Sequence, residues 1–517
     1  MQFEFLIPEN LDLASLQSSL QENNRIHQDS ERTVYRTFYD SFDWRLYRDN
    51  SLLEDSRDGK GHTLSRRTLK GASSDTRLQL KKVPRFASEM PRGRFRDLLE
   101  PVLEMRELLP KVRIRSRIKT LRVLNSDDKT VAWLVLEKNT LPKQQGTRSM
   151  KLGERAIIIP VKGYRKPCRQ IAGLLEELGL TAANDDLMTV ALSSIGLTPG
   201  NYSTKLDLVL DPAMRTDQAC KLILHRLLDI MLQNEAGTRT GTDTEFLHDF
   251  RVAIRRTRSA LTQVKKVFPK RIVDRYKKEF AWLGLMTSPS RDLDVYLLNF
   301  DKYRASLSAT MQADIEPLRD FLIRHQQREH KALVKALDSA RYRRLISSWR
   351  DFLELPVNEH TTLKNARRPV IQVGSKRIWN VYRRILKEGA AIKPETPAEA
   401  LHDLRKTGKK LRYLMEFFQS LYPAAEISKL IKALKLLQDN LGNFQDYEVQ
   451  VLTLKKFSHQ MVAEGGVSPN TLLAMGMLID GLERRQHEAR EEFAERFAKF
   501  SLLENQHQFR ELFASSH

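Results

Sequence analysis

The stretch LHDFRVAIRRTR, residues 247–258, returns 154 residues later as LHDLRKTGKKLR, residues 401–412. The same register holds beyond both stretches, because Asp292 and Asp446 are separated by the same interval. A repeat of this length indicates two copies of one structural unit. The pattern therefore predicts a fold built from two similar halves, each containing one copy of this stretch.

Both copies carry a histidine followed by three cations at helical spacing, and we call each set of four residues a ladder. On a helix, positions i, i+3, i+7 and i+10 share one face. The residues at these positions are His248, Arg251, Arg255 and Arg258 in the first copy, and His402, Arg405, Lys409 and Arg412 in the second. Arg256, Lys406 and Lys410 add cations beside the ladders. Like charges at this spacing destabilise a helix by about a few tenths of a kcal/mol per pair, so we expect an anionic partner.

Phosphate is the partner that these residue types suit best. Arginine donates paired hydrogen bonds to phosphate oxygens, lysine supplies a point charge, and histidine adds a donor that can gain a proton. The alternative is that the ladders are solvated helix faces and that the two histidines are satisfied core residues. The recurrence of the pattern at a constant interval favours binding.

The composition agrees with a polyanionic partner. The 517 residues include 87 Lys and Arg against 65 Asp and Glu, which gives a net charge of +22. Such a balance favours nucleic acid, polyphosphate or an anionic membrane surface, although a generally basic protein remains the plain alternative. Composition alone does not choose among these polyanions.

The chain has few signs of export. Cys168 and Cys220 are the only cysteines, too few for a disulfide framework, which fits a reducing cytoplasm. The first residues lack a basic segment followed by an apolar run, so no signal peptide is expected. No apolar stretch is long enough for a membrane span.

The first 200 residues alternate with period two, which predicts an antiparallel sheet with some helix. The clearest strand is Lys111–Lys119, in which Arg113, Arg115 and Arg117 fall on one face. The other expected strands are 3–7, 33–39, 64–70, 78–82, 131–138 and 155–161. We also expect a hairpin turn at 58–61.

From about residue 205 the period changes to 3.6, which predicts an all-helical region. The expected helices are 213–235, 245–268, 273–285, 293–304, 315–337, 342–353, 368–387, 397–421, 425–441, 446–464 and 470–498. We therefore expect two domains, residues 1–200 and 205–517. The second would hold repeats at about 205–355 and 364–510, divided near the polar stretch 356–362.

The repeated stretches, together with Leu437–Gly442 and Asp446, resemble a CHAD domain, the conserved histidine α-helical domain. The resemblance implies a double four-helix bundle with an internal pseudo-twofold repeat and a basic channel that binds inorganic polyphosphate. It implies that both ladders, with Arg256, Lys406 and Lys410, line that channel. One departure is Gln445, which stands where the first copy has Arg291; another is Gly408, which weakens its helix by up to about 1 kcal/mol.

The first 200 residues resemble a divergent CYTH domain, the triphosphate-tunnel fold, through Tyr35–Asp40, Leu69-Lys70 and Leu136-Glu137. The resemblance implies phosphate-binding roles for Lys70, Arg113, Arg115 and Arg117 and metal-binding roles for Glu4 and Glu137. The opening motif of that family is Glu-x-Glu-x-Lys, and this chain has Gln2, Glu4 and Leu6 in its place. A metal site for phosphoryl transfer needs converging carboxylates, so we expect a tunnel-like domain without catalysis.

The sequence thus predicts a cytoplasmic protein, associated with polyphosphate granules, that binds inorganic polyphosphate and also tripolyphosphate, and needs no cofactor. One alternative is an inorganic triphosphatase that uses Mg²⁺ or Mn²⁺. The second alternative is a nucleic-acid-binding scaffold. The chain lacks helix-turn-helix and zinc-finger spacing, and its aromatic residues are not interleaved with the ladders.

Overall fold

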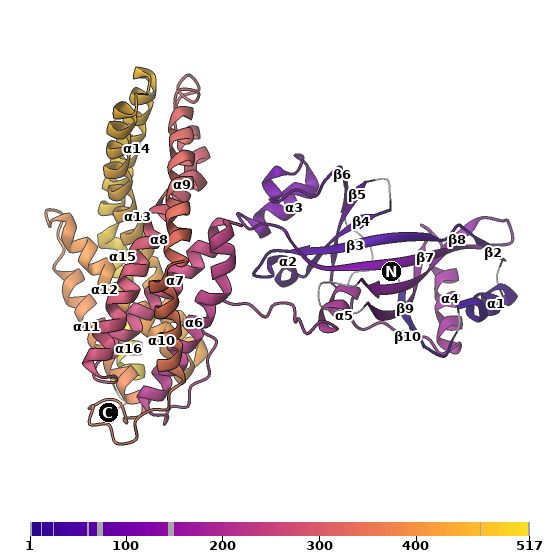
Figure 1. Ribbon diagram of the computed structural model, residues 1–517, viewed down its shortest axis with the longest axis horizontal. Coiled ribbons are helices and arrows are strands. Elements are labelled where there is room, and N and C mark those ends of the chain that lie inside the picture. Colours follow the sequence, from indigo (N-terminus) through magenta and orange to yellow (C-terminus); the bar gives the residue numbers. More distant parts are fainter. Residues whose placement is uncertain are drawn as a thin grey trace. The chain divides into compact units, whose positions relative to one another are not determined.

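A computed structural model describes residues 3–11, 13–23, 25–58, 61–69, 76–142, 149–465 and 467–514. The chain divides into two compact units, Met1–Ser203 and Thr204–His517. The first is built on a sheet and the second is helical, which confirms the predicted fold class (Figure 1). Within the described part of the chain, no helix combines the length and the apolar character that crossing a bilayer requires.

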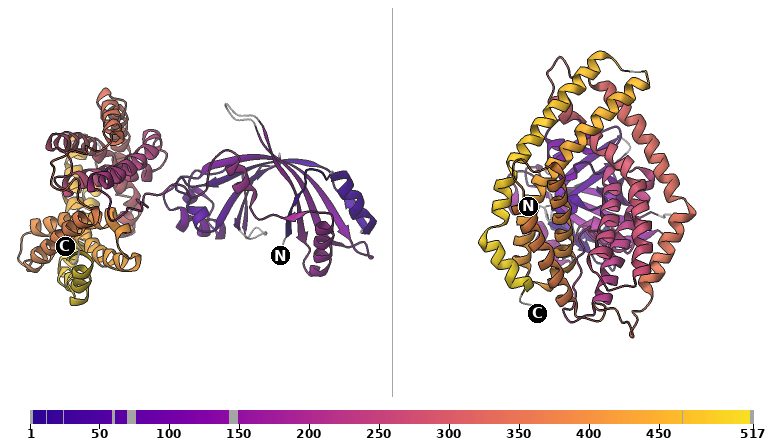
Figure 2. Two further views of the ribbon diagram at one scale, coloured as in Figure 1. Left: turned by 90° about the horizontal axis from the view of Figure 1, so that it is seen from below. Right: turned by 90° about the vertical axis from the view of Figure 1, so that its left-hand side faces the viewer.

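Within its described residues, the sheet unit has ten strands, which form one curved antiparallel sheet (Figures 1 and 2). Its strands follow the order β10-β1-β9-β8-β7-β3-β4-β5-β6, and β2 pairs with β7. The strands are β1 (Phe3–Ile7), β2 (Arg25–Gln28), β3 (Arg32–Asp40), β4 (Ser51–Arg57), β5 (His62–Thr68), β6 (Thr76–Leu80), β7 (Leu109–Leu124), β8 (Thr130–Leu141), β9 (Met150–Pro160) and β10 (Thr181–Ala182). The flanking helices are α1 (Leu13–Asn23), α2 (Arg45–Arg48), α3 (Arg94–Leu103), α4 (Arg165–Glu177) and α5 (Leu187–Ser193).

The strand register decides which charged residues share a face. Residues directly opposite one another on antiparallel strands point to the same face, and neighbours along a strand alternate. Arg36 is opposite Ile114, whereas Arg113 is opposite Thr37. Glu137 is opposite Ile118 and Arg155. Arg36, Glu137 and Arg155 therefore share one face, here called the carboxylate face. Arg113, Arg115 and Arg117 lie on the other.

Helices cover parts of both faces. The helices α1 and α4 pack over Phe5, Leu121, Ala156 and Ile158, which lie on the same face as Arg113. The helix α5 packs with Phe38, Val112 and Ile114 on the carboxylate face. Arg113, Arg115 and Arg117 stay exposed between the packed regions.

The helical unit contains long antiparallel helices (Figure 1). They are α6 (Thr216–Thr240), α7 (Thr244–Gln263), α8 (Lys270–Ala305), α9 (Glu316–Leu337), α10 (Ala340–Glu354), α11 (Val370–Ala390), α12 (Ala398–Phe418), α13 (Ala424–Ala463), α14 (Pro469–Glu491), α15 (Phe493–Phe500) and α16 (Leu503–Ala514). The starts of α6, α7 and α8 each precede the starts of α11, α12 and α13 by 154 residues.

The division into helices differs from the sequence prediction at three places, and α16 was not expected. The helix α8 is continuous where we expected a break after Leu285, and it contains Pro289. The carbonyl oxygen of Gly284, one turn before that proline, accepts side-chain hydrogen bonds from Thr287 and Ser288, both at 2.9 Å. Buried residues on both sides of Pro289 hold the helix together, so packing overrides the local cost of proline.

The helix α13 is likewise continuous through the expected break after Leu441. The residue of lowest helix propensity there is Gly442, which reduces the stability of the helix by only about 1 kcal/mol. The expected helix 470–498 is divided into α14 and α15 at Glu492. Each helix that carries a ladder is therefore followed by one long continuous helix: α7 by α8, and α12 by α13.

A pair of reciprocal hydrogen bonds relates the two halves. The amide of Thr216 donates to the carbonyl of Arg368 at 3.0 Å, and the amide of Val370 donates to the carbonyl of Met214 at 2.8 Å. The two donors, Thr216 and Val370, are 154 residues apart, and so are the two acceptors, Met214 and Arg368. This exchange is what a local twofold axis between the starts of α6 and α11 would produce, and it supports the proposed pseudo-twofold relation of the bundles.

Candidate functional site

The first ladder lies on α7, which begins where the Asp243 carboxylate caps it. That side chain accepts hydrogen bonds from the amides of Glu245 and Phe246, at 3.0 and 3.3 Å. One side of α7 is buried through Phe250, Ile254 and Leu261. The apolar side therefore fixes the rotation of the helix, and the ladder faces away from this core.

The two ladders meet where α7 packs against α12. Arg255 of the first donates from Nε to the hydroxyl of Tyr413 on α12 at 2.7 Å. Burial, followed by the charges of Arg405 and Arg255, lowers the pKa of Lys409 to about 8. Because Arg255 acts on Lys409 directly, cations from both repeats lie within electrostatic range of each other.

Five of the predicted cations form one coupled group, here called the cationic face. Arg412 also lowers the pKa of Lys409, and burial lowers the pKa of Arg251, to which the charge of Arg255 adds. The members of the cationic face are Arg251, Arg255, Arg405, Lys409 and Arg412. Its acidic neighbours include Asp446, 3.0 Å from Arg405, Glu416, 3.4 Å from Arg412, and Asp292, whose charge acts on Arg251.

Two members of the cationic face are held by the long partner helices. Arg251 donates from Nη1 to Thr287 Oγ1 at 2.8 Å and to Ser288 Oγ at 3.0 Å on α8. Arg405 donates from Nη2 to Asp446 Oδ1 on α13 at 3.0 Å. Within the described residues, the Nε atom of Arg405 is buried and has no hydrogen-bond partner.

The two histidines fix each ladder helix to its long partner. The Nδ1 atom of His248 lies 3.0 Å from Nη2 of Arg291, which can only donate, so this nitrogen accepts. His402 makes the equivalent contact with Oε1 of Gln445. The amide nitrogen of Gln445 donates to Glu448 at 2.9 Å, so its oxygen faces the histidine and Nδ1 of His402 donates. The histidines occupy equivalent positions with opposite hydrogen-bond polarity.

Of the remaining predicted cations, Arg258 lies beside Gly284 of α8, near Arg251, and the other three have separate surroundings. Arg256 donates to Glu416 at 2.9 Å and to the carbonyl of Thr204 at 2.8 Å. Lys406 is exposed and pairs with Asp403 at 3.1 Å. Lys410 lines a separate pocket, and Arg258 is exposed on α7.

Sequence reasoning did not nominate two residues that organise the site, Arg291 and Tyr413. Arg291 contacts His248, and the signal for it was its position 43 residues after that histidine, matched by Gln445 after His402. Tyr413 carried no such signal, because its counterpart in the first repeat is Ser259.

In the sheet unit, the carboxylates of the carboxylate face are paired with arginines. Glu137 is buried and accepts two hydrogen bonds from Arg36, one of them at 2.9 Å. Arg36 also lies 3.3 Å from Glu54. Glu4 pairs with Arg155, whose side chain is fully buried. The carboxylates therefore already have cations as neighbours.

These residues do not fit a divalent metal. A Mg²⁺ or Mn²⁺ ion needs free carboxylate oxygens, and both oxygens of Glu137 are engaged by Arg36. In the described part of the chain, no cluster of three His, Cys, Asp or Glu side chains could hold a metal. Gln2 and Lys70 lie outside the described residues. Leu6 is opposite Arg155 on the carboxylate face and offers no ligand atom.

The arginine strand of the sequence prediction lies away from these carboxylates. Arg113, Arg115 and Arg117 are exposed on the opposite face of the sheet from Glu137. Arg113 lines a pocket of about 730 Å³ there, together with Arg57, Asp55 and His62. The structure therefore does not bring the two groups of predicted residues together.

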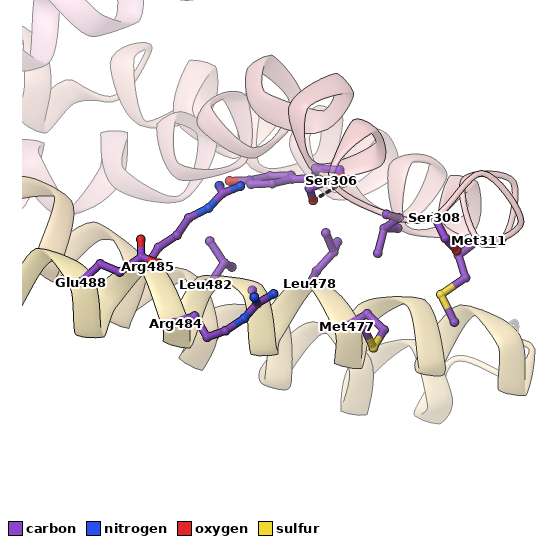
Figure 3. Close-up of a pocket in the computed structure, with 12 residues that line it drawn as sticks. Ser306, Ser308, Met311, Met477, Leu478, Leu482, Arg484, Arg485 and Glu488 are labelled. Atoms are coloured by element: carbon purple, nitrogen blue, oxygen red, sulfur yellow. Dashed lines mark hydrogen bonds between the residues drawn. The ribbon is translucent and has the colours of Figure 1, made fainter.

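A smaller pocket, of about 280 Å³, lies between the end of α8 and α14 (Figure 3). Arg485 extends from α14 across this pocket, and Leu478 and Met477 line it beside Ser308. No member of the cationic face lines it. It is therefore distinct from the candidate site.

Comparison with known proteins agrees with the helical assignment. The family model of the CHAD domain matches residues 222–455, which confirms the resemblance of the helical unit. The uncharacterized protein MT2285 of Mycobacterium tuberculosis is 26% identical over 317 residues, which cover 55% of this chain. The chain spans about half the length of this curated relative, 56% of it.

Two solved structures match different parts of the chain. The CHAD domain from Ricinus communis is 23% identical, with a TM-score of 0.44, and covers 60% of this chain and 95% of its own. HpAC1 from Hippeastrum, described as a candidate adenylyl cyclase with a dominant triphosphatase activity, is 13% identical, with a TM-score of 0.27. That match covers 39% of this chain and 99% of HpAC1.

Proposed function

We propose that the helical unit binds inorganic polyphosphate along the cationic face. The observation that carries the proposal is the convergence of cations from both repeats where Arg255 of α7 contacts Tyr413 of α12, with which the lowered pKa of Lys409, caused by burial and the neighbouring arginines, agrees. Cations crowded in this way repel one another in the free protein. A chain of closely spaced phosphates would relieve that repulsion and form charge-assisted hydrogen bonds with the arginines. We propose no cofactor for this binding.

Polyphosphate fits better than nucleic acid for two reasons. Polyphosphate consists of phosphates alone, so cations that recur at each helical turn, about 5.4 Å apart, can contact it along its whole length with no need to accommodate bases. Single-stranded nucleic acid is normally held by stacking on aromatic rings as well, and the aromatic residue of the site, Tyr413, accepts a hydrogen bond from Arg255.

The test is competition between long-chain polyphosphate and DNA for the full chain at one salt concentration. Binding of both should weaken as salt rises, since each neutralised phosphate releases counterions. Polyphosphate should displace DNA at equal phosphate concentration. If DNA displaces polyphosphate instead, the nucleic-acid scaffold becomes the better function.

The binding of polyphosphate should depend on pH through Lys409. An anionic ligand favours the charged ammonium, so binding draws a proton onto Lys409 near its free pKa of about 8. Affinity should be full below pH 8 and should fall as pH rises from 8 toward 10. Isothermal titration in buffers of different ionisation enthalpy would measure the proton uptake. A Lys409→Arg variant, which keeps its charge, should bind without this dependence; the same decline in that variant would contradict the assignment.

We also propose that the sheet unit does not hydrolyse triphosphates. Catalysis there would need Mg²⁺ or Mn²⁺, and the carboxylates are paired with Arg36 and Arg155. The full chain with tripolyphosphate and either metal should release orthophosphate far more slowly than about 1 per second, the lower range of working enzymes. Faster release, lost on changing Glu137 to Gln, would establish the triphosphatase alternative.

The proposed location is the cytoplasm, in association with polyphosphate granules. The proposal rests on two free cysteines, Cys168 and Cys220, both buried, which fit a reducing compartment. Fluorescence microscopy of the tagged chain beside stained granules would test it.

A further inference from the structure

A second basic pocket in the helical unit lies apart from the cationic face. It has a volume of about 660 Å³ and is lined by the end of α7, the start of α8, and α11 and α12. Seven Lys and Arg side chains and one carboxylate, Asp274, line it. None of the five residues of the cationic face is among them.

Most of these cations have no ionic partner of their own. Lys270 pairs with Asp274, and Arg384 pairs with Glu388. Within the described residues, no carboxylate lies within ion-pairing distance of Lys266, Lys277 or Lys410. Arg377 donates to Gln263 at 2.8 Å, and burial, with the charge of Arg384, lowers its pKa. The pocket thus concentrates positive charge that the protein does not neutralise.

The repeat explains what is unusual about this pocket. Each residue that lines this pocket has an equivalent residue in the other half, 154 positions away, and these equivalents line a corresponding groove. The equivalent of Lys410 is Arg256, and the equivalent of Lys266 is Ser420. In that groove the chain's own segment 204–210 is bound. The carbonyl of Thr204 accepts a hydrogen bond from Arg256 at 2.8 Å, and the amide of Leu210 donates to Ser420 at 3.1 Å.

The two grooves differ in chemistry as well as in occupancy. The occupied groove has Ile223, Ile230 and Ile431 where the open pocket has Arg377, Arg384 and Lys277. Leu206 and Leu210 of the bound segment are buried, which suits those isoleucines. The counterpart of the segment in the second half, residues 358–364, starts away from the pocket, where Glu359 and the carbonyl of Asn358 engage Arg215, and reaches the pocket lining only at Leu363.

We propose that the open pocket binds a compact ligand with two or more phosphate groups. Replacement of isoleucines by cations removes the affinity for an apolar peptide segment and creates a site for dense negative charge. Lysine and arginine donors on α8, α11, α12 and the loop between α7 and α8 surround the space, which suits a short cluster of phosphates. The ligand can be a free inorganic chain or the phosphate group of an organic molecule, because both present the same chemistry.

Acetylation of lysines, followed residue by residue with mass spectrometry, tests this site in the full chain. Inorganic tripolyphosphate or ATP, at about ten times its Kd, should slow acetylation of Lys266, Lys277 and Lys410 by about tenfold. The neighbouring exposed Lys278, which does not line the pocket, should react at an unchanged rate. Protection by tripolyphosphate alone would identify an inorganic ligand, and protection by ATP as well would identify an organic phosphate as acceptable.

Matched variants separate this site from the cationic face. Lys277→Glu should abolish protection of Lys266 and Lys410, whereas Lys278→Glu, with the same change in net charge, should keep it. An Arg255→Glu and Lys409→Glu double variant should keep the protection too, since it alters only the cationic face. The inference is overturned if neither phosphate ligand protects these lysines, or if only an acidic peptide does.

Discussion

Replacing both Arg255 and Lys409 by glutamate should weaken polyphosphate binding by at least about 100-fold. Each lost charge-assisted contact is worth about 1–3 kcal/mol, and reversal adds repulsion between the new carboxylates and the phosphates. The two residues belong to different repeats but act on each other electrostatically. We therefore expect each single variant to lose part of the affinity and the double variant to lose more than either.

The control for this experiment is a double variant with the same change in net charge. Lys278 and Lys302 are exposed on α8, outside the cationic face, and both can be changed to glutamate. Fluorescence anisotropy with labelled polyphosphate at constant salt would compare the variants. An equal loss in the control would mean that the overall charge of the chain, and not this site, accounts for binding.

The sequence predicted the organisation of the helical unit because the repeat carries it directly. The constant interval of 154 residues reappears in the starts of three pairs of helices. The ladder positions also came together as helical periodicity suggested, at Arg251, Arg255, Arg405, Lys409 and Arg412. Local spacing is sufficient within each helix, since residues on one helical face are neighbours whatever the tertiary structure, whereas the contact of α7 with α12 brings the two sets together.

Tertiary contacts, which local spacing does not predict, give equivalent residues of the two repeats different surroundings. Arg256 and Lys410 occupy equivalent positions, yet Arg256 is neutralised by Glu416 while Lys410 lines an open pocket. The difference comes from Glu416, whose counterpart is Thr262, and from the segment that begins at Thr204. Neither contact has a local sequence signal.

In the sheet unit, the alternation of residues 111–119 correctly indicated a strand, but alternation does not say which face meets the carboxylates. That depends on the pairing register, which is set by strands far away in the sequence. The register of β3 and β8 on β7 places Glu137 opposite Ile118, so the neighbouring Arg117 points away from it. The cation that does meet Glu137 is Arg36, on β3.

Replacing Arg36 by methionine should destabilise the sheet unit by about 3–5 kcal/mol, the usual effect of leaving a buried charge without its partner. Glu137 is buried and Glu54 is 14% exposed, so neither carboxylate can recover its hydration when Arg36 is lost. Hydrogen exchange resolved by peptide should report faster opening in β3, β7 and β8. Exchange in α7, which belongs to the other unit, should not change.

A second substitution distinguishes the lost charge from lost packing. Methionine keeps much of the length and apolar volume of arginine, so the Arg36→Met change acts mainly on the charges of Glu54 and Glu137. Adding Glu137→Gln removes one of the two buried carboxylate charges that lost their partner, and it should restore part of the stability lost in the single variant. If the double variant is less stable than Arg36→Met alone, Glu137 is stabilised by something other than Arg36. The pairing of carboxylates with arginines would then no longer explain why this face does not fit a metal.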